Sequence, residues 1–145
     1  MLTSRAPRRQ VMAGMAGMGL FSLTEGCRRT PRCLTCGMTL DLTSRWYAEV
    51  TAAGHTDGFD TPKCALRRLL TPGAPAGTLT VRGYYRQEKL PGERVVFAAG
   101  SDVLGPMGAD LVPVEPEHAV KFRVEHHAAK TLPLAELTLA LVEAT

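Results

Sequence analysis

The pattern of hydrophobic and polar positions predicts two strands and a helix in the first part of the chain. Residues 45–51 (RWYAEVT) alternate polar and apolar side chains, which is typical of a half-buried strand. A turn at Ala52–Gly54 separates them from a returning strand at 55–59. Next, Asp60 or Thr61 can cap a helix that has Pro62 at its first position, so we predict a helix over residues 62–70.

The second part repeats this order loosely after a linker rich in proline and glycine at residues 71–77. The same patterns predict a strand, a polar turn, a strand, a glycine-rich loop and a short strand, at residues 78–85, 87–93, 94–99, 100–108 and 111–114 respectively. Pro116 predicts the start of a helix that continues to about His126, with Val120 and Val124 facing the core. A last amphipathic helix is predicted from the spacing of Leu134, Leu137 and Leu141.

These elements predict an α+β fold with two small ββα-type halves. The first half spans residues 27–77 and contains the motif CxxCGM. The second half spans residues 78–145 and contains the loop GPMG.

The N-terminal residues have the features of an export signal rather than of a folded element. Arg5, Arg8 and Arg9 precede an uncharged, mostly apolar stretch at residues 11–23. This order is typical of a secretory signal, so residues 1–26 are left out of the fold prediction. The paired arginines favour twin-arginine routing, and Gly26-Cys27 is typical of a lipoprotein cleavage site, which predicts acylation of Cys27.

Composition and charge narrow the function classes. The chain has 145 residues, 45% of them apolar, which is enough for one compact domain with a core. The formal net charge is +3, and residues 1–26 carry +2 of it, so the remainder is close to neutral. This balance argues against a nucleic-acid-binding protein that relies on a basic face. No apolar run approaches the roughly 20 residues that a membrane-spanning helix requires.

The sulfur-containing residues carry the candidate chemistry. Beyond Cys27 the chain has three cysteines, and an odd number disfavours a complete disulfide framework. Of six methionines, only Met38 and Met107 lie outside residues 1–26. Both occur next to glycine in loop motifs, at residues 33–38 (CLTCGM) and 105–108 (GPMG). Core methionines usually sit among apolar neighbours, so these two are candidate ligands instead.

Thiolates and thioethers together form a soft donor set that selects Cu(I). Gly37 allows the backbone between Cys36 and Met38 to turn so that both sulfur atoms face one ion, and Met107 can close the site from the second half. Cys64 lies in the first turn of the predicted helix beside Lys63. We expect the helix dipole and that charge to lower its pKa and to favour the thiolate.

Two other interpretations remain open from the residues alone. In the first, the protein is a thiol-dependent enzyme, either an organometal lyase or a disulfide oxidoreductase, with Cys64 as nucleophile and Asp60 as the nearby acid. In the second, Cys33, Cys36, Cys64 and one histidine hold a structural zinc ion, and metal removal unfolds the protein.

Three segments, in this order and spacing, resemble the NosL family of copper-binding lipoproteins that assist nitrous oxide reductase maturation. They are residues 33–38, residues 59–64 (FDTPKC) and residues 100–108 (GSDVLGPMG), and the resemblance covers residues 27 to about 125. It implies two ββα-type halves similar to part of the organomercurial lyase fold. It also implies a protein on the periplasmic face of a membrane, anchored through a lipid on Cys27.

The resemblance further implies a copper carrier and not an enzyme. Such a protein binds one Cu(I), receives it through an associated copper-transport system and passes it to nitrous oxide reductase or a related copper enzyme. Carried over by position, Cys36, Met38 and Met107 are the first candidate ligands, followed by Cys33 and Cys64.

Overall fold

The computed structural model describes residues 30–145. The predicted export signal and Cys27 lie outside this part, so their assignments stay predictions. Within residues 30–145, no helix combines the length and the apolar character that crossing a bilayer requires.

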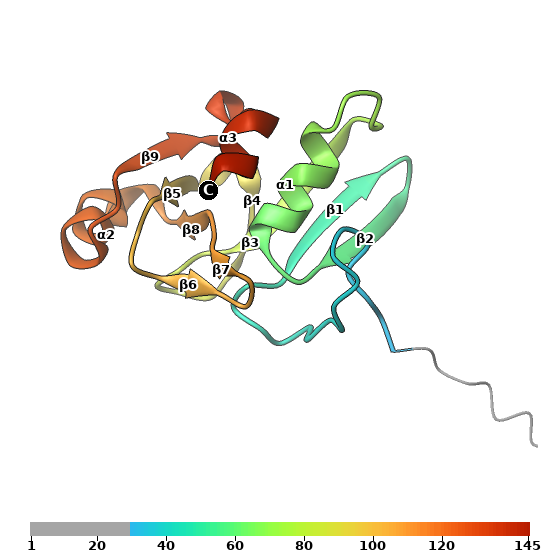
Figure 1. Cartoon of the computed structure of the whole chain (residues 1–145), viewed down its shortest axis with the longest axis horizontal. Coiled ribbons are helices and arrows are strands. Elements are labelled where there is room, and N and C mark those ends of the chain that lie inside the picture. The colour runs from blue at the N-terminus through green and yellow to red at the C-terminus, as the bar shows by residue number, and fades with distance from the viewer. Residues whose placement is uncertain (1–29) are drawn as a thin grey trace, which may run out of the picture.

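A four-stranded antiparallel sheet with helix α1 on one face forms the first layer (Figure 1). Its strand order is β2-β1-β3-β4, with β1 at Ala48–Ala52, β2 at His55–Phe59, β3 at Gly77–Arg82 and β4 at Lys89–Pro91. The first hairpin pairs Ala48 with Phe59, which confirms the predicted returning strand. The β1–β2 turn uses a positive φ at Ala53 and at Gly54.

Helix α1 spans Pro62–Leu70, as predicted. Thr61 is the N-cap, because its side chain accepts a 3.2 Å hydrogen bond from the backbone N–H of Cys64. Pro62 occupies the first turn, where its missing N–H has no partner to lose. The buried side of the helix carries Cys64, Ala65 and Leu66, so one end of the packed face presents a thiol.

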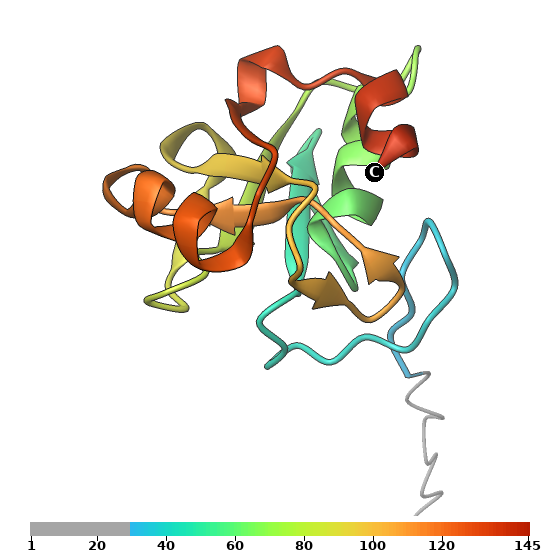
Figure 2. The ribbon, with the colours of Figure 1, turned by 60° about the vertical axis from the view of Figure 1, so that its left-hand side comes forward.

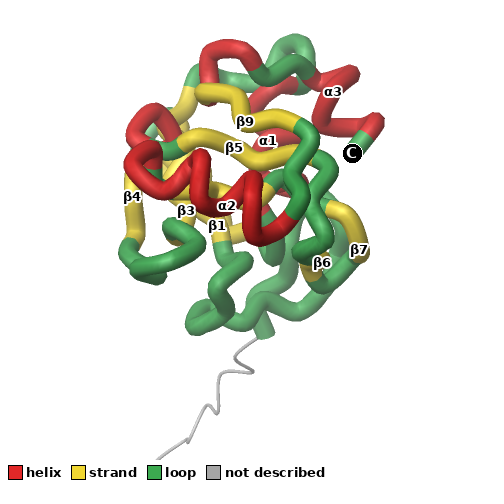
Figure 3. The backbone as a smooth tube through the Cα atoms, turned by 90° about the vertical axis from the view of Figure 1, so that its left-hand side faces the viewer, coloured by secondary structure: helices red, strands yellow, loops and turns green. Residues whose placement is uncertain are grey.

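A second, three-stranded antiparallel sheet has β5 at its centre, between β8 and β9. Its strands are β5 (Val96–Ala99), β8 (Val112–Val114) and β9 (Lys130–Pro133). Helix α2 (Ala119–His126) packs against β5 and β9 (Figure 3). Between β5 and β8 the chain makes a small hairpin of β6 (Leu104–Gly105) and β7 (Gly108–Ala109).

Short helical segments complete the fold. Three single 3₁₀ turns lie at Gly92–Arg94, Pro116–His118 and Leu134–Glu136. The C-terminal helix α3 (Leu139–Ala144) packs against α1 (Figure 2). The described residues therefore form a mixed α+β fold built from hairpins and helices, which confirms the predicted fold class.

The two sheets share one main hydrophobic cluster. Its largest fully buried side chains include Phe59, Leu66, Leu79 and Phe97. Strands β3 and β4 follow residue 77 in the sequence but belong to the first sheet, so that sheet draws on both predicted halves. A smaller cluster surrounds Phe122 under α2.

Several local predictions were wrong. Residues 89–91, predicted as part of a polar turn, pair with β3 as strand β4, and residues 130–133 form a strand that no pattern indicated. Val120 and Val124, predicted to face the core, are 77% and 72% exposed. A 3₁₀ turn precedes α2, and Phe122 takes the core side. In an α-helix, a residue two positions away from Phe122 points roughly 200° around the helix axis from it, so Val120 and Val124 lie on the opposite side.

The predicted C-terminal helix also differs from the observed one. Leu134 lies in a 3₁₀ turn, the chain is extended at Leu137, and the helix begins only at Leu139 after the cap Thr138. Val142 and Leu137 are the buried residues of this segment, whereas Leu141 is partly buried against the main cluster.

Candidate metal centre

The structure brings all three described cysteines together. The sulfur atoms of Cys33, Cys36 and Cys64 and a carboxylate oxygen of Asp60 all lie within 4.8 Å of one another. The three cysteines are free thiols. Two of them come from the loop that precedes β1, and the third comes from the first turn of α1. The arrangement joins segments that are about thirty residues apart in sequence.

The loop at residues 33–38 is shaped by its own backbone. The N–H of Cys33 donates to the carbonyl of Met38 at 2.8 Å, and the N–H of Gly37 donates to the carbonyl of Cys33 at 2.9 Å. Gly37 has a φ of +77°, a conformation that glycine adopts without steric penalty. The tight turn predicted at Gly37 is therefore confirmed, and it returns the chain so that Cys33 and Cys36 lie on one side.

A side-chain hydrogen bond attaches this loop to the helix. The hydroxyl of Thr35 donates to the backbone carbonyl of Cys64 at 3.0 Å. Because Thr35 lies between the two loop cysteines, this bond attaches the loop that carries two of the thiols to the helix turn that carries the third.

Asp60 completes the cluster. Its position in the sequence predicted a helix cap or an acid, but Thr61 takes the capping role, so Asp60 does not cap the helix. It is buried, and neither of its side-chain oxygens has a hydrogen-bond partner. Burying a carboxylate without a partner is unfavourable, and a cation bound among the thiols would stabilise it. Asp60 was not predicted as a ligand, although its place four residues before Cys64 in the segment FDTPKC was a usable signal.

Burial favours the neutral form of two thiols at this site, those of Cys64 and Cys36. Burial raises the pKa of the Cys64 thiol well above its usual value, and the neighbouring Asp60 carboxyl and Cys33 thiol raise it further. Burial also raises the pKa of Cys36, although the Met38 backbone opposes this. The expectation that Lys63 and the helix dipole lower the pKa of Cys64 was therefore wrong, because desolvation dominates. A metal that binds as a thiolate complex must release these protons.

The two candidate methionines are exposed and lie on different loops. Met38 belongs to the cysteine loop and its side chain is 41% exposed, whereas Met107 lies between β6 and β7 and is 55% exposed. Their ligation stays a prediction.

The hairpin that carries Met107 is held against the start of α1. The Asp110 carboxylate accepts a 3.1 Å hydrogen bond from the backbone N–H of Lys63, and Lys63 Nζ donates to the carbonyl of Ala109 at 3.4 Å. Lys63 directly precedes Cys64, so the hairpin lies next to the helix turn that presents the thiol (Figure 2).

Histidines do not take part in the cluster as residues 30–145 define it. His55 and His126 form pairs with Asp57 and Asp102 instead, each at 3.0 Å. The fourth group beside the three thiols is Asp60.

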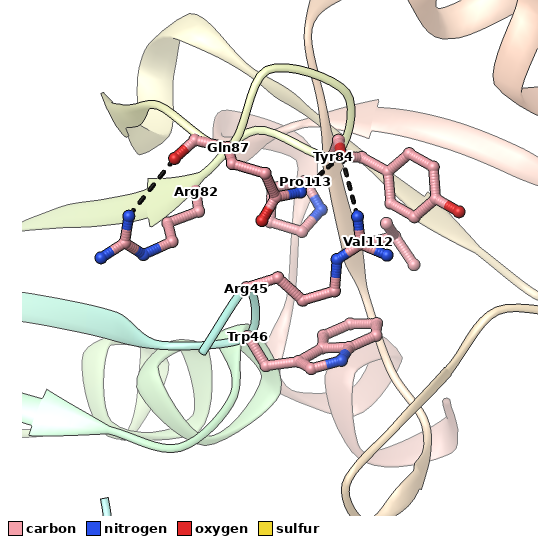
Figure 4. A pocket seen from close by; sticks show the side chains of 7 residues that line it. All are labelled: Arg45, Trp46, Arg82, Tyr84, Gln87, Val112 and Pro113. Atoms are coloured by element: carbon pink, nitrogen blue, oxygen red, sulfur yellow. Dashed lines mark hydrogen bonds between the residues drawn. The ribbon is translucent and has the colours of Figure 1, made fainter. Parts of the chain in front are cut away.

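A small cavity elsewhere contains no sulfur donor. It lies between Arg45, Trp46, Arg82, Tyr84, Gln87, Val112 and Pro113 (Figure 4). Gln87 and Arg45 donate hydrogen bonds to the backbone carbonyl of Tyr84 across it. Its volume of about 10 Å³ is close to that of a single water molecule, so it is a packing gap rather than a ligand site.

The set of donor atoms at this site suits two metal ions. Three thiolates are soft ligands that suit Cu(I), and three thiolates with one carboxylate also suit tetrahedral Zn²⁺. The fold and this cluster define a small α+β protein with a thiol-rich candidate metal centre built on a loop and a helix N-terminus.

Comparison with known proteins gives the family. The chain belongs to the NosL family, whose sequence model matches residues 27–142. Its structure is similar to the crystal structure of the copper chaperone NosL from Shewanella denitrificans. The TM-score is 0.66 at 17% sequence identity, and the match covers 92% of this chain and 99% of that chain. No curated protein matches the sequence. The family resemblance inferred from the three motifs is thus confirmed, and the structural likeness shows a shared fold.

Proposed function

We propose that this protein is a Cu(I) carrier. The observation that carries the proposal is the meeting of three free thiols and a buried, unpartnered carboxylate within 4.8 Å in a member of the NosL family. The similar solved structure is that of a copper chaperone, which supports a carrier role rather than catalysis. We further propose that the recipient is nitrous oxide reductase or a related copper enzyme, and that an associated copper-transport system supplies the ion.

The candidate ligands differ in solvent exposure, from buried thiols on one side of the site to exposed thioethers on the other. Cys33 and Cys64 are buried, whereas Cys36 is only partly buried and Met38 and Met107 are exposed. An incoming thiolate, thioether or imidazole can therefore reach copper on the side of Cys36 and the methionines first. Ligands would then be exchanged one at a time, and the inner thiols would be the last to release the ion. Because the outer donors lie on loops, this exchange need not open the core.

The proposed location follows from the sequence outside the described residues. An export signal with acylation of Cys27 would place the protein on the periplasmic face of a membrane, as a lipoprotein. Mass spectrometry of the protein purified from membranes tests this point directly, since acylation adds the mass of the lipid to a chain that starts at Cys27.

The decisive experiment is a metal competition. Residues 28–145 are loaded anaerobically with equal amounts of Cu(I) and Zn(II), and metal content and X-ray absorption are measured. We expect one copper per chain with sulfur-dominated coordination. Cys36→Ser and Cys64→Ser should each reduce copper retention, and His55→Ala, at an exposed histidine outside the cluster, should leave it unchanged. Retention of zinc in preference to copper would contradict the carrier proposal.

A structural zinc site is the second candidate function, and Asp60 is the observation that favours it. A carboxylate is a harder ligand than a thiolate and is common at zinc sites. A thiol-dependent enzyme has less support, because a catalytic cysteine needs a lowered pKa and burial raises that of Cys64.

A further inference from the structure

Exposed apolar side chains gather on two segments of the fold. Among residues 30–145, seven large apolar side chains are exposed, and five of them belong to the loop before β1 or to the β6–β7 hairpin. These five are Leu34, Met38, Leu42, Leu104 and Met107. We call them the apolar end. The other two, Val120 and Val124, lie on helix α2.

Hydrogen bonds hold both segments to the same turn of helix α1. The loop is attached by the bond from Thr35 to the Cys64 carbonyl, and the hairpin is attached by the contacts of Lys63 with Asp110 and Ala109. Figures 1 and 3 show the loop and the hairpin in the lower part of the molecule, and the described chain also begins there at residue 30. The two segments that carry the apolar end therefore lie on the side of the molecule from which the N-terminal tether arrives.

The tether is short. Only five residues separate Cys27, the predicted acylation site, from Cys33. A fully extended chain advances by at most about 3.6 Å per residue, so an acyl chain on Cys27 would hold Cys33 within roughly 22 Å of the lipid. A tether this short restricts the orientation of the folded part and favours those orientations in which the end near Cys33 faces the membrane.

Positive charge accompanies the apolar side chains. Arg28 and Arg29 lie in the tether, Arg32 is exposed at the start of the loop, and Lys63 lies beside the hairpin. Cationic side chains next to apolar ones favour binding to an anionic bilayer surface. Electrostatic attraction to the lipids and burial of apolar area both contribute to this binding.

We propose that the apolar end is a membrane-docking surface. Leu34, Leu42 and Leu104 enter the boundary between headgroups and acyl chains, and Arg32 and Lys63 contact anionic lipid phosphates. The orientation rests on the acylation of Cys27 in the proposed function, whereas the contact itself comes from the side chains of the folded part. Docking would turn the thiol cluster toward the bilayer, where a membrane-embedded copper source presents its ion, and release from the lipid would free it for a recipient.

Vesicle sedimentation tests this surface without copper. Residues 28–145 contain every described element and both apolar clusters, so this chain keeps the whole fold. The metal-free, reduced protein is mixed with vesicles of phosphatidylglycerol and phosphatidylethanolamine at millimolar lipid. We expect it to sediment with these vesicles and much less with neutral phosphatidylcholine. The double variant Leu34→Ser/Leu104→Ser should reduce the partition coefficient by about tenfold or more.

The matched control removes two apolar side chains from another exposed face. Val120→Ser/Val124→Ser on α2 should leave vesicle binding unchanged, and circular dichroism should show that both double variants are folded. The proposal is overturned if the parent chain does not sediment with anionic vesicles. That result would indicate that the apolar end binds a protein partner instead of a membrane. It is also overturned if the α2 variant loses as much binding. Since no copper is present, a failure of Cu(I) binding and a failure of membrane docking are separate results.

Discussion

The hydroxyl of Thr35 donates a 3.0 Å hydrogen bond to the backbone carbonyl of Cys64. This bond spans 29 positions of sequence and links the cysteine loop to the first turn of α1. Apart from it, the loop is held mainly by bonds within residues 31–40. The geometry of the candidate metal centre therefore depends on a side chain that is not itself a ligand.

Removing this bond should weaken metal binding more than it weakens the fold. Thr35→Val keeps the shape of the side chain and deletes the donor. A net hydrogen bond contributes about 1 kcal/mol, so we expect Cu(I) affinity to fall by about fivefold as the loop thiols lose their fixed distance from Cys64. A chelator competition measures the affinity. Thr43→Val is the control, because its hydroxyl bonds only to the exposed Asp41, and equal losses in the two variants would refute the role of Thr35.

The methionines should matter for copper and not for zinc. Met38→Leu and Met107→Leu keep volume and apolar character but remove the thioether. Because both side chains are exposed, the free energy of unfolding should be unchanged. We expect each variant to lose about tenfold in Cu(I) affinity, equivalent to ~1.4 kcal/mol, while Zn²⁺ affinity stays constant. Competition titrations with both metals provide the measurement.

A control for the methionine variants is Leu34→Ala in the same loop, which removes an exposed apolar side chain without removing a donor. It should bind copper as the parent does. If both methionine variants also bind Cu(I) like the parent, the thioether ligands are wrong and the site consists of thiols and Asp60 alone.

Asp60 should set metal preference. A carboxylate is a hard ligand, so Asp60→Asn should reduce affinity for Zn²⁺ more than affinity for Cu(I). The ratio of the two dissociation constants, measured by competition, reports this preference. Asp57→Asn on β2 is the control, since that carboxylate pairs with exposed His55 and lies outside the cluster. Equal losses for both metals at Asp60 would show that the carboxylate does not select between them.

Local signals in the sequence were strong enough to predict the first hairpin and helix α1. Thr61 and Pro62 mark the start of a helix through interactions within the first turn, and the observed helix has the predicted ends. The motif around Gly37 was equally informative, because a turn with positive φ between Cys36 and Met38 favours glycine. These local features were also what allowed the family to be inferred.

Features that depend on tertiary contacts were missed. Residues 130–133 become a strand because β5 offers an open edge, and residues 89–91 pair with β3, which no short pattern reveals. Asp60 was not predicted as a ligand because its role depends on Thr61 taking the cap. The pKa of Cys64 was predicted in the wrong direction, since burial by the main cluster outweighs the helix dipole.

Metal removal should leave the protein folded. The main hydrophobic cluster joins both sheets through residues such as Leu79 and Phe97, and among its buried members only Cys33 and Cys64 are candidate ligands. We expect chelation to keep the far-ultraviolet circular dichroism and to increase hydrogen exchange only in residues 33–38. The bound ion should raise the melting temperature through mass action alone. Cooperative unfolding on chelation would instead support the structural zinc site.

The buried carboxyl of Asp110 couples stability to pH. Burial raises its pKa to about 6 from 3.8, although hydrogen bonds from Thr61 and from the N–H groups of Leu111 and Lys63 oppose this. The folded protein therefore binds this proton more tightly than the unfolded chain. The contribution of the protonated group to stability is complete below pH 3.8 and is lost as pH rises through 6. For a shift of this size the loss is about 3 kcal/mol.

Asp110→Asn removes this titration and keeps a carbonyl oxygen that can accept from the N–H groups of Lys63 and Leu111. We expect the variant to be more stable than the parent at pH 7.5 by up to about 3 kcal/mol, and to differ little near pH 4, where the parent carboxyl is protonated. Urea unfolding at the two pH values measures the difference. Glu143→Gln at the exposed end of α3 should show no such pH-dependent gain. A gain of the same size at both pH values would assign the effect of Asp110 to packing rather than to its proton.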